Sequence, residues 1–151
     1  MKLSKHFCPL PWMSLEVETL GTFAPCCQYD FDQSIRRKDG SLMSITNGDT
    51  ILDAFNSTDM RELRAAFLRG EKPPGCSACW TEESVPGRKS KRINSYIKFK
   101  SLLTEIDWEA EEQKIMFLDL KLGNICNLKC RICGAWSSSK WIQETIDIGF
   151  A

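Results

Sequence analysis

The sequence predicts an α+β module followed by one strand–loop–helix unit of the α/β kind, and three patterns predict it. Residues 12–19 alternate apolar and polar side chains, which is typical of a half-buried strand, and a glycine turn follows at 20–22. Residues 59–69 repeat apolar side chains at helical spacing. Residues 114–122 are apolar at six of nine positions and lead through a loop into the helix-like segment 136–146.

The first pattern extends to a hairpin. Residues 23–27 are the expected returning strand behind the turn at Gly21. If this hairpin forms, Cys8 and Cys26 can lie close together at its open end. Residues 29–48 are polar and rich in turn-forming side chains, so we expect a loop or a second short hairpin there.

Two helices are expected in the middle of the module. A short helix covers residues 50–55, and a longer one covers residues 59–69 with Ser57 or Thr58 as its N-cap. The apolar face of the longer helix consists of Met60, Leu63 and Phe67. Gly70 is expected to end it.

A proline pair follows the longer helix and prevents its continuation. Pro73-Pro74 stands directly before Cys76-Ser77-Ala78-Cys79. We therefore expect this C-x-x-C motif to form a tight turn immediately after the helix stops.

The segment that follows the C-x-x-C motif is first basic and then acidic. Between residues 86 and 100 there are six basic side chains and no acidic one, namely Arg88, Lys89, Lys91, Arg92, Lys98 and Lys100. They indicate a solvated linker or helix face, or else a rim that binds an anionic substrate or nucleic acid with Tyr96 and Phe99 available for stacking. Residues 102–113 are acidic and are predicted to be helical. Because neighbouring segments of opposite charge can neutralise each other, a nucleic-acid partner is not expected.

The composition is that of a globular protein. The 151 residues are 42% hydrophobic and 26% charged, with a formal net charge of zero, so no overall field favours nucleic acid or a membrane. No apolar run approaches the ~20 residues of a membrane helix, and the N-terminal residues lack the apolar stretch of a signal peptide. We therefore expect a cytoplasmic protein without a membrane partner.

Eight cysteines are many for a cytoplasmic chain of this length. They stand at positions 8, 26, 27, 76, 79, 126, 130 and 133. In a reducing compartment, clustered cysteines bind metal more often than they form disulfides. An even number would also suit a secreted disulfide scaffold, but the short spacings and the missing signal peptide favour metal.

Three of the cysteines lie in one short loop. Cys126, Cys130 and Cys133 have the spacing C-x3-C-x2-C and follow a turn at Gly123-Asn124. A four-iron cluster usually takes four thiolates, so this loop is either an incomplete site or holds a cluster with one open iron. Zinc is the alternative, and its fourth ligand would have to come from elsewhere, His6 being the only histidine.

This loop resembles the cluster-binding motif of the radical S-adenosylmethionine superfamily. The resemblance implies that its three cysteines ligate a catalytic [4Fe–4S] cluster whose open iron binds S-adenosylmethionine. In that superfamily one electron cleaves the cofactor to methionine and a 5'-deoxyadenosyl radical, which abstracts hydrogen from the substrate. The resemblance also implies cofactor contacts at Ile132 and Gly134, with Ile132 standing where the family usually has an aromatic residue. It assigns no catalytic acid or base.

The N-terminal cysteines carry a second resemblance. Residues 6–84 are similar to the auxiliary-cluster modules called SPASM and twitch domains, in the hairpin with Gly21 and in the helix that ends at Gly70 before the C-x-x-C motif. The resemblance implies a closed second [4Fe–4S] cluster for electron transfer or structure, with the ligands Cys8, Cys26, Cys76 and Cys79. Cys27 is then a spare thiol. Four thiolates also suit a structural zinc ion, which stays an alternative.

Together the two resemblances divide the chain into three parts. Residues 1–85 form the auxiliary-cluster module, residues 86–113 a basic and then acidic helical linker, and residues 114–151 the start of a radical S-adenosylmethionine barrel. The module normally follows the barrel, whereas here it precedes it, as in a twitch-type subgroup. The family's barrel has six βα units, and residues 114–151 hold one. We therefore expect an incomplete (β/α)6-type barrel from a truncated or split gene product.

The expected function is iron–sulfur cluster binding with the radical chemistry of an oxidoreductase or maturase, although the chain alone is expected to be too short for full activity. The expected partners are S-adenosylmethionine, an electron donor protein and a chain that supplies the rest of the barrel. Two other functions stay open. One is a two-cluster electron-transfer protein, and the other is a zinc-stabilised interaction module that could bind nucleic acid through residues 88–100.

Overall fold

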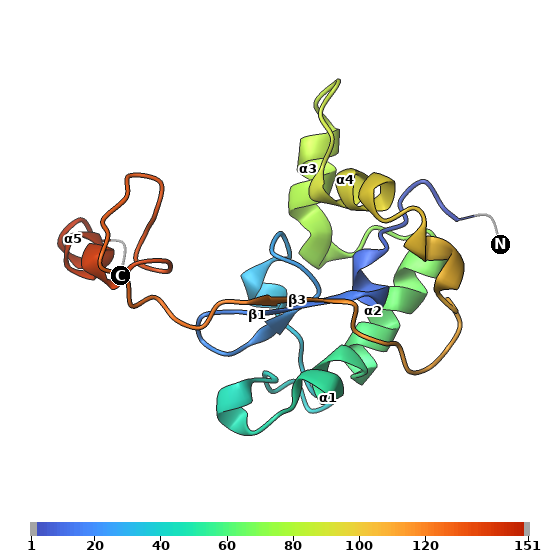
Figure 1. Cartoon of the computed structure of the whole chain (residues 1–151), viewed down its shortest axis with the longest axis horizontal. Helices are drawn as coiled ribbons and strands as arrows, with labels where there is room; N and C mark the ends of the chain where they lie inside the picture. The colour runs from blue at the N-terminus through green and yellow to red at the C-terminus, as the bar shows by residue number, and fades with distance from the viewer. Residues whose placement is uncertain (1–2, 150–151) are drawn as a thin grey trace.

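A three-stranded sheet in the order β2-β1-β3 lies at the centre of the computed structural model, which describes residues 3–149 (Figure 1). β1 (Ser14–Val17) and β2 (Phe23–Ala24) are antiparallel. β3 (Phe117–Leu120) pairs with the other edge of β1 in parallel. The predicted hairpin is confirmed, and its turn depends on Gly21, whose φ of 81° favours glycine.

The two central helices are confirmed as well. α1 (Ile51–Phe55) begins with a capping box formed by Thr50 and Asp53, and α2 (Thr58–Leu68) begins at Ser57, whose Oγ accepts a hydrogen bond from the Met60 amide. α2 ends before Gly70, whose φ of 80° allows the chain to leave the helix in the left-handed conformation.

The core lies between α2 and the sheet. The predicted apolar face of α2 is buried, with Met60, Leu63 and Phe67 exposed by 8% or less. These three side chains belong to one buried cluster with residues of the hairpin and of the segment before it, namely Phe7, Leu10, Trp12, Met13, Leu15, Val17 and Phe23.

Arg64 is the one charged side chain that α2 buries in the described part of the chain. Its guanidinium donates to the carbonyl oxygens of Pro11 (2.8 Å) and Phe55 (2.6 Å) and lies 4.7 Å from the centroid of the Phe55 ring. Burial lowers the pKa of Arg64 to about 10. The side chain therefore joins η1 (Leu10–Trp12) to α1 through backbone carbonyls, whose hydrogen-bonding capacity has to be satisfied when they are buried.

The C-x-x-C motif forms the beginning of a helix, so the prediction of a tight turn was wrong. η4 (Pro74–Cys76) runs directly into α3 (Ser77–Glu83), with Cys76 as its N-cap and Cys79 in its first turn. Pro74 is the first residue of this 3-10 turn, where the missing amide proton costs no hydrogen bond. α4 (Lys91–Lys98) follows and is capped by Ser90.

The acidic segment 102–113 is helical only at η5 (Leu102–Glu105), which corrects the longer predicted helix. Packing overrides the local preference, because Leu103 and Ile106 are buried in the core and the indole N–H of Trp12 donates to the carbonyl of Trp108. The other short 3-10 turns are η1 (Leu10–Trp12), η2 (Phe31–Gln33), η3 (Ile45–Asn47) and η6 (Ser139–Trp141).

The neutralisation predicted between the basic and acidic segments is not found in residues 3–149. The salt bridge of the basic run joins Arg92 to Glu83 in α3, and none reaches the acidic segment in that part of the chain. The two aromatic residues predicted to be available for stacking differ in exposure. Phe99 packs on Phe117 at a centroid distance of 4.5 Å, whereas Tyr96 is exposed.

β3 is a strand as predicted, but it is exposed at all four positions, which corrects the expectation of a buried strand. It is attached on one side through its pairing with β1 and through mutual hydrogen bonds between Asn56 and Gln113. No strand of the described residues pairs with its other edge (Figure 1).

The chain after β3 forms a separate lobe that ends in α5 (Ile142–Asp147) (Figure 1). The helix predicted at 136–146 is therefore shorter and begins later. Ser137 does not cap it, and Ser138 instead donates its hydroxyl to the carbonyl of Leu128. Between residues 3 and 149 we find no helix with the length and apolar character needed to cross a membrane.

Candidate metal centre

Four cysteines from three separate segments line one small cavity in the N-terminal module. Cys8 precedes η1, Cys26 follows β2, and Cys76 and Cys79 stand at the start of α3. Tyr29 and Arg92 line the same cavity. The structure thus brings together the four positions that the sequence assigns to the auxiliary site.

Hydrogen bonds to backbone carbonyls hold these segments against one another. The hydroxyl of Ser14 donates to the carbonyl of Pro25 at 2.7 Å, which fixes the residue before Cys26 on β1. The amide of Asp30 donates to the carbonyl of Gly75 at 2.8 Å, which ties the chain after β2 to the start of α3.

Gly75 also permits a close approach that carries Tyr29 over the start of α3. A Cβ atom on Gly75 would lie 2.4 Å from Cζ of Tyr29, closer than any real contact. The Tyr29 ring therefore occupies the place of a side chain beside Cys76. Burial raises the pKa of its hydroxyl well above the usual range.

Burial dominates the electrostatics of the thiols. It raises the pKa of Cys8 well above its ordinary value, and neighbouring thiolates at Cys26, Cys76 and Cys79 raise it further. Burial likewise raises the pKa of Cys26 and of Cys76 to about 12. Without metal these thiols are protonated, so a metal that binds here must displace their protons.

Arg92 is the cation beside the cavity. Its guanidinium pairs with Glu83 at 2.5 Å and 2.9 Å and donates to the backbone carbonyls of Lys5 and Phe7 at 3.0 Å and 2.8 Å. Its charge opposes the effect of burial on the pKa of Cys76. The sequence identified Arg92 only as one of six basic residues and not as part of the site, because nothing in that run distinguishes it from its exposed neighbours.

The donor set fits an iron–sulfur cluster. Four thiolates are the usual ligands of a four-iron cluster, and here they share one cavity with a cation at its side. In such a cluster each thiolate binds a different iron. Among residues 3–149 no group of three Cys, His, Asp or Glu side chains is placed to hold a metal ion directly.

Cys26 and Cys27 face different surroundings. Cys26 is half-buried and belongs to the four-cysteine cavity, whereas Cys27 is exposed and lines a second cavity beside α4. The structure therefore groups Cys26, and not Cys27, with the other three cysteines. His6 is also engaged elsewhere, since its Nδ1 lies 3.0 Å from the carbonyl oxygen of Gly70.

The three-cysteine loop lies in the C-terminal lobe, apart from this cavity. Cys126 and Cys133 are half-buried, and Cys130 is exposed. The loop is closed at its base, where the side chain of Asn124 donates a hydrogen bond to the carbonyl oxygen of Ala135 at 2.9 Å. Two further bonds connect it to the helix side, from Ser138 to the Leu128 carbonyl and from Trp141 to the Cys130 carbonyl.

The two residues assigned to cofactor contacts flank Cys133. Ile132 is 94% exposed, so it lies free at the loop surface. Gly134 lies against the ring of Trp136, where a Cβ atom would come within 2.2 Å of the indole. Trp136 is thus a neighbour of the loop that the sequence did not single out.

Comparison with known families concerns the N-terminal module. Residues 8–80 match the family model SPASM, described as an iron–sulfur cluster-binding domain. No curated protein and no solved structure matches the chain. The matched region contains all four cysteines that line the cavity. The resemblance to SPASM modules is confirmed over these residues, and it supports iron–sulfur cluster binding by the module.

Proposed function

We propose that this chain is a radical S-adenosylmethionine-type protein with two iron–sulfur clusters. The N-terminal module holds an auxiliary cluster through Cys8, Cys26, Cys76 and Cys79, and the loop of Cys126, Cys130 and Cys133 holds the catalytic one. The observation that carries the proposal is the parallel pairing of β3 with β1. It joins the strand that leads into the three-cysteine loop directly to the sheet of the SPASM-matching module.

The catalytic loop supplies three thiolates and leaves the fourth metal position to a ligand. When bound there, S-adenosylmethionine supplies the 5'-deoxyadenosyl radical after one-electron reduction. Asn124, Ser138 and Trp141 hold the loop backbone through their hydrogen bonds to loop carbonyls. The exposed Ile132 offers apolar surface to the cofactor.

The auxiliary site has a different task because its four thiolates leave no metal position open. Electron transfer or structural support is the chemistry left to such a site. The charge of Arg92 partly offsets the negative charge that four thiolates bring into the cavity. An electron donor protein is the partner that this chemistry requires.

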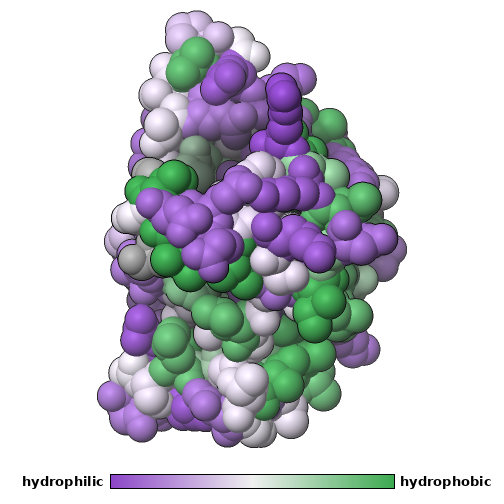
Figure 2. Space-filling view, turned by 90° about the vertical axis from the view of Figure 1, so that its left-hand side faces the viewer, coloured by the Kyte–Doolittle hydropathy of each residue, from purple (hydrophilic) through white to green (hydrophobic). Residues whose placement is uncertain are grey.

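The exposed strand β3 is the proposed attachment point for the rest of a barrel. Parallel strands are normally covered on both faces, yet Leu118 and Leu120 are each 46% exposed and Leu122 is 93% exposed. Figure 2 views the molecule from the side of the C-terminal lobe and shows apolar patches among polar side chains on that face. Further parallel strands, from this protein or a second chain, would cover the exposed leucines of β3.

The test is cluster reconstitution without oxygen. The purified chain is treated with iron and sulfide, both are quantified, and electron paramagnetic resonance spectra are recorded with and without S-adenosylmethionine. We expect two clusters, one of which changes its spectrum when the cofactor is added. Cys126→Ala should remove that cluster alone, and Cys79→Ala should remove the other.

Three results would contradict the proposal. Two clusters that both ignore the cofactor would indicate an electron-transfer protein. A colourless protein that contains zinc and no iron would indicate a zinc-stabilised module. A loss of both clusters in Cys126→Ala, with the fold retained by circular dichroism, would contradict two independent sites.

A further inference from the structure

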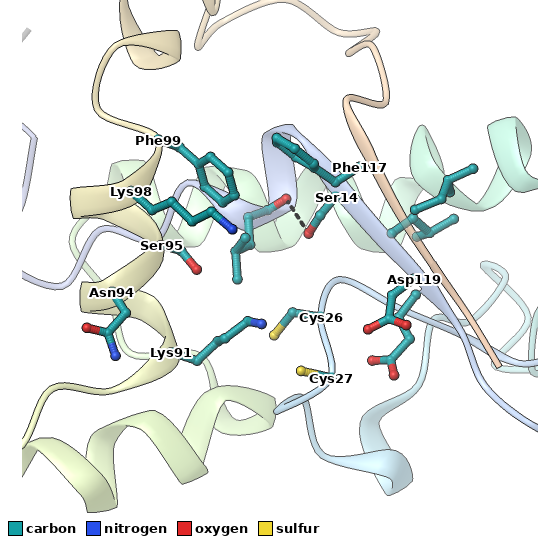
Figure 3. Close-up of a pocket in the computed structure, with 14 residues that line it drawn as sticks. Ser14, Cys26, Cys27, Lys91, Asn94, Ser95, Lys98, Phe99, Phe117 and Asp119 are labelled. Carbon is teal, nitrogen blue, oxygen red and sulfur yellow. Dashed lines mark hydrogen bonds between the residues drawn. The ribbon is translucent and has the colours of Figure 1, made fainter.

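A second cavity of about 320 Å³ lies between α4 and the sheet, beside the four-cysteine cavity (Figure 3). Leu10 and Cys26 line both cavities, so one wall separates them. The volume is at the lower end of the range for small-molecule sites, about 300–1,000 Å³. Cys26 is the one proposed cluster ligand among the residues that line this second cavity.

One wall of the cavity is a polar stripe of α4. The stripe consists of Lys91, Asn94, Ser95 and Lys98. These residues are spaced by three and four positions, so they share one face of the helix. Figure 3 shows the two lysine side chains reaching from α4 toward the strands. α4 is fixed in this orientation from its other face, where Arg92 is held by Glu83 and by two backbone carbonyls.

The opposite wall is one face of the sheet. Ser14 and Glu16 of β1 stand directly opposite Phe117 and Asp119 of β3 in the parallel register. Side chains alternate along a strand, so these four residues share a face, and all four line the cavity. Asp119 is exposed and is drawn across the cavity from Lys91 in Figure 3.

Nearby cations balance only part of the negative charge on the acidic wall. Glu16 is fully buried, and its ion-pair partner is Lys121, whose Nζ lies 2.7 Å from Oε1. Its Oε2 has no hydrogen-bond partner within the described residues, and Lys121 is shared with Glu18 at 2.9 Å. One lysine therefore faces two carboxylates, and Asp119 adds a third without an ion-pair partner in residues 3–149.

The lysines and the aromatic end complete the site. Lys91 and Lys98 have no carboxylate partner within salt-bridge distance in the part of the chain that the structure describes. Phe99 and Phe117 pack together at a centroid distance of 4.5 Å and form an apolar end. The cavity thus has a cationic wall, an anionic wall and an aromatic end.

We propose that this cavity binds a free α-amino acid with an apolar side chain. Its carboxylate pairs with Lys91 and Lys98, and its ammonium group pairs with Asp119 in the negative field of Glu16. Its side chain packs against Phe99 and Phe117. The acidic wall disfavours phosphates and nucleotides, and the two lysines disfavour simple cations, so both charges of the ligand are needed.

The test is direct binding, measured by isothermal titration calorimetry with L-phenylalanine and L-leucine. This measurement needs no cluster, so it is carried out on the full chain with and without iron. N-acetyl-L-phenylalanine and L-phenylalanine amide each lack one charge. We expect each of them to bind at least about tenfold more weakly than L-phenylalanine, as the loss of one charged hydrogen bond implies.

Variants test the two walls separately. Lys91→Gln and Asp119→Asn alter exposed side chains, so the fold is expected to remain. Asp119→Asn should weaken L-phenylalanine about tenfold but leave the binding of the N-acetyl form unchanged. Lys100→Gln, an exposed basic residue outside the cavity, is the matched control and should bind like the native chain.

Three outcomes would overturn the proposal. The first is no heat of binding at millimolar amino acid. The second is binding that neither Lys91→Gln nor Asp119→Asn weakens. The third is tighter binding of a blocked form than of the free amino acid, which would indicate a peptide or a ligand with a single charge.

Discussion

The guanidinium of Arg92 lies over the indole ring of Trp80, with its central carbon 5.1 Å from the ring centroid. Trp80 directly follows Cys79, and Arg92 donates to the carbonyl of Phe7, which directly precedes Cys8. One side chain of α4 therefore holds the chain at the first and the last cysteine of the cavity.

Replacing Arg92 by glutamine should destabilise the protein by about 3 kcal/mol, because it leaves the Glu83 carboxylate largely buried without its partner. Side-chain exposures of 9% for Arg92 and 18% for Glu83 place this ion pair mostly out of water. The measurement is the free energy of unfolding in urea. Arg92→Lys should recover only part of the loss, since one ammonium group cannot reproduce the bonds to both Glu83 and the backbone carbonyls.

Arg69→Gln is the matched control for that experiment. Arg69 forms ion pairs with Glu62 and Glu71, but all three side chains are about half exposed or more. Exposed ion pairs contribute little, so this variant should unfold close to the native chain. Equal losses for the two arginines would contradict the role of burial at Arg92.

Gly75→Ala should displace the Tyr29 ring. The added Cβ atom would come within 2.4 Å of Tyr29 Cζ, so either the ring or the start of α3 must move. Overpacking of this kind costs about 1–3 kcal/mol, and the shift should also lower the iron content of the reconstituted module. Thermal unfolding and iron analysis measure the two effects.

A double variant shows whether Tyr29 is the cause. In a Tyr29→Ala background, Gly75→Ala should lose most of its effect, because the obstructing ring is gone. Ala78→Ser, an exposed change between Cys76 and Cys79, should alter neither stability nor iron content. An undiminished effect of Gly75→Ala in the double variant would place the strain elsewhere.

Features set by local patterns were predictable from the sequence. The hairpin around Gly21, the α2 face and the Ser57 cap follow from alternation, helical spacing and side-chain capping, and all are found. The grouping of Cys8, Cys26, Cys76 and Cys79 was expected from resemblance, and the structure places the four around one cavity.

Features that depend on distant contacts were not predictable. The helix expected at 102–113 is mostly absent because Leu103 and Ile106 pack into the core, which no local pattern reveals. Arg92 looked like its basic neighbours, since its partners are Glu83 and carbonyls more than eighty residues earlier. The exposure of β3 also depends on what covers it, which its apolar composition does not specify.

Glu16→Gln should flatten the pH dependence of stability. Burial raises the pKa of Glu16 above its ordinary value of 4.5, although Lys121 opposes this. The folded state therefore takes up a proton at higher pH than the unfolded chain, and this carboxyl makes the protein more stable as the pH falls through the raised pKa toward 4.5.

The glutamine variant has no such carboxyl, so its stability should not show this contribution. Urea unfolding of both proteins at several pH values between 7 and 4.5 measures the difference. The native chain should gain stability relative to Glu16→Gln toward the acidic end of this range. Parallel curves, or a relative loss for the native chain, would contradict a pKa raised by burial.

Cys26→Ser and Cys27→Ser form a matched pair that tests the auxiliary site. The two residues are neighbours and both line the cavity beside α4, but only Cys26 also lines the cavity with Cys8, Cys76 and Cys79, and Cys27 is exposed. Both changes are made in a chain whose Cys126, Cys130 and Cys133 are serine, so all bound iron belongs to the module. We expect Cys26→Ser to lose most of its iron and sulfide, because a closed four-thiolate cluster then lacks one ligand. Cys27→Ser should retain both, and the reverse pattern would make Cys27 the ligand.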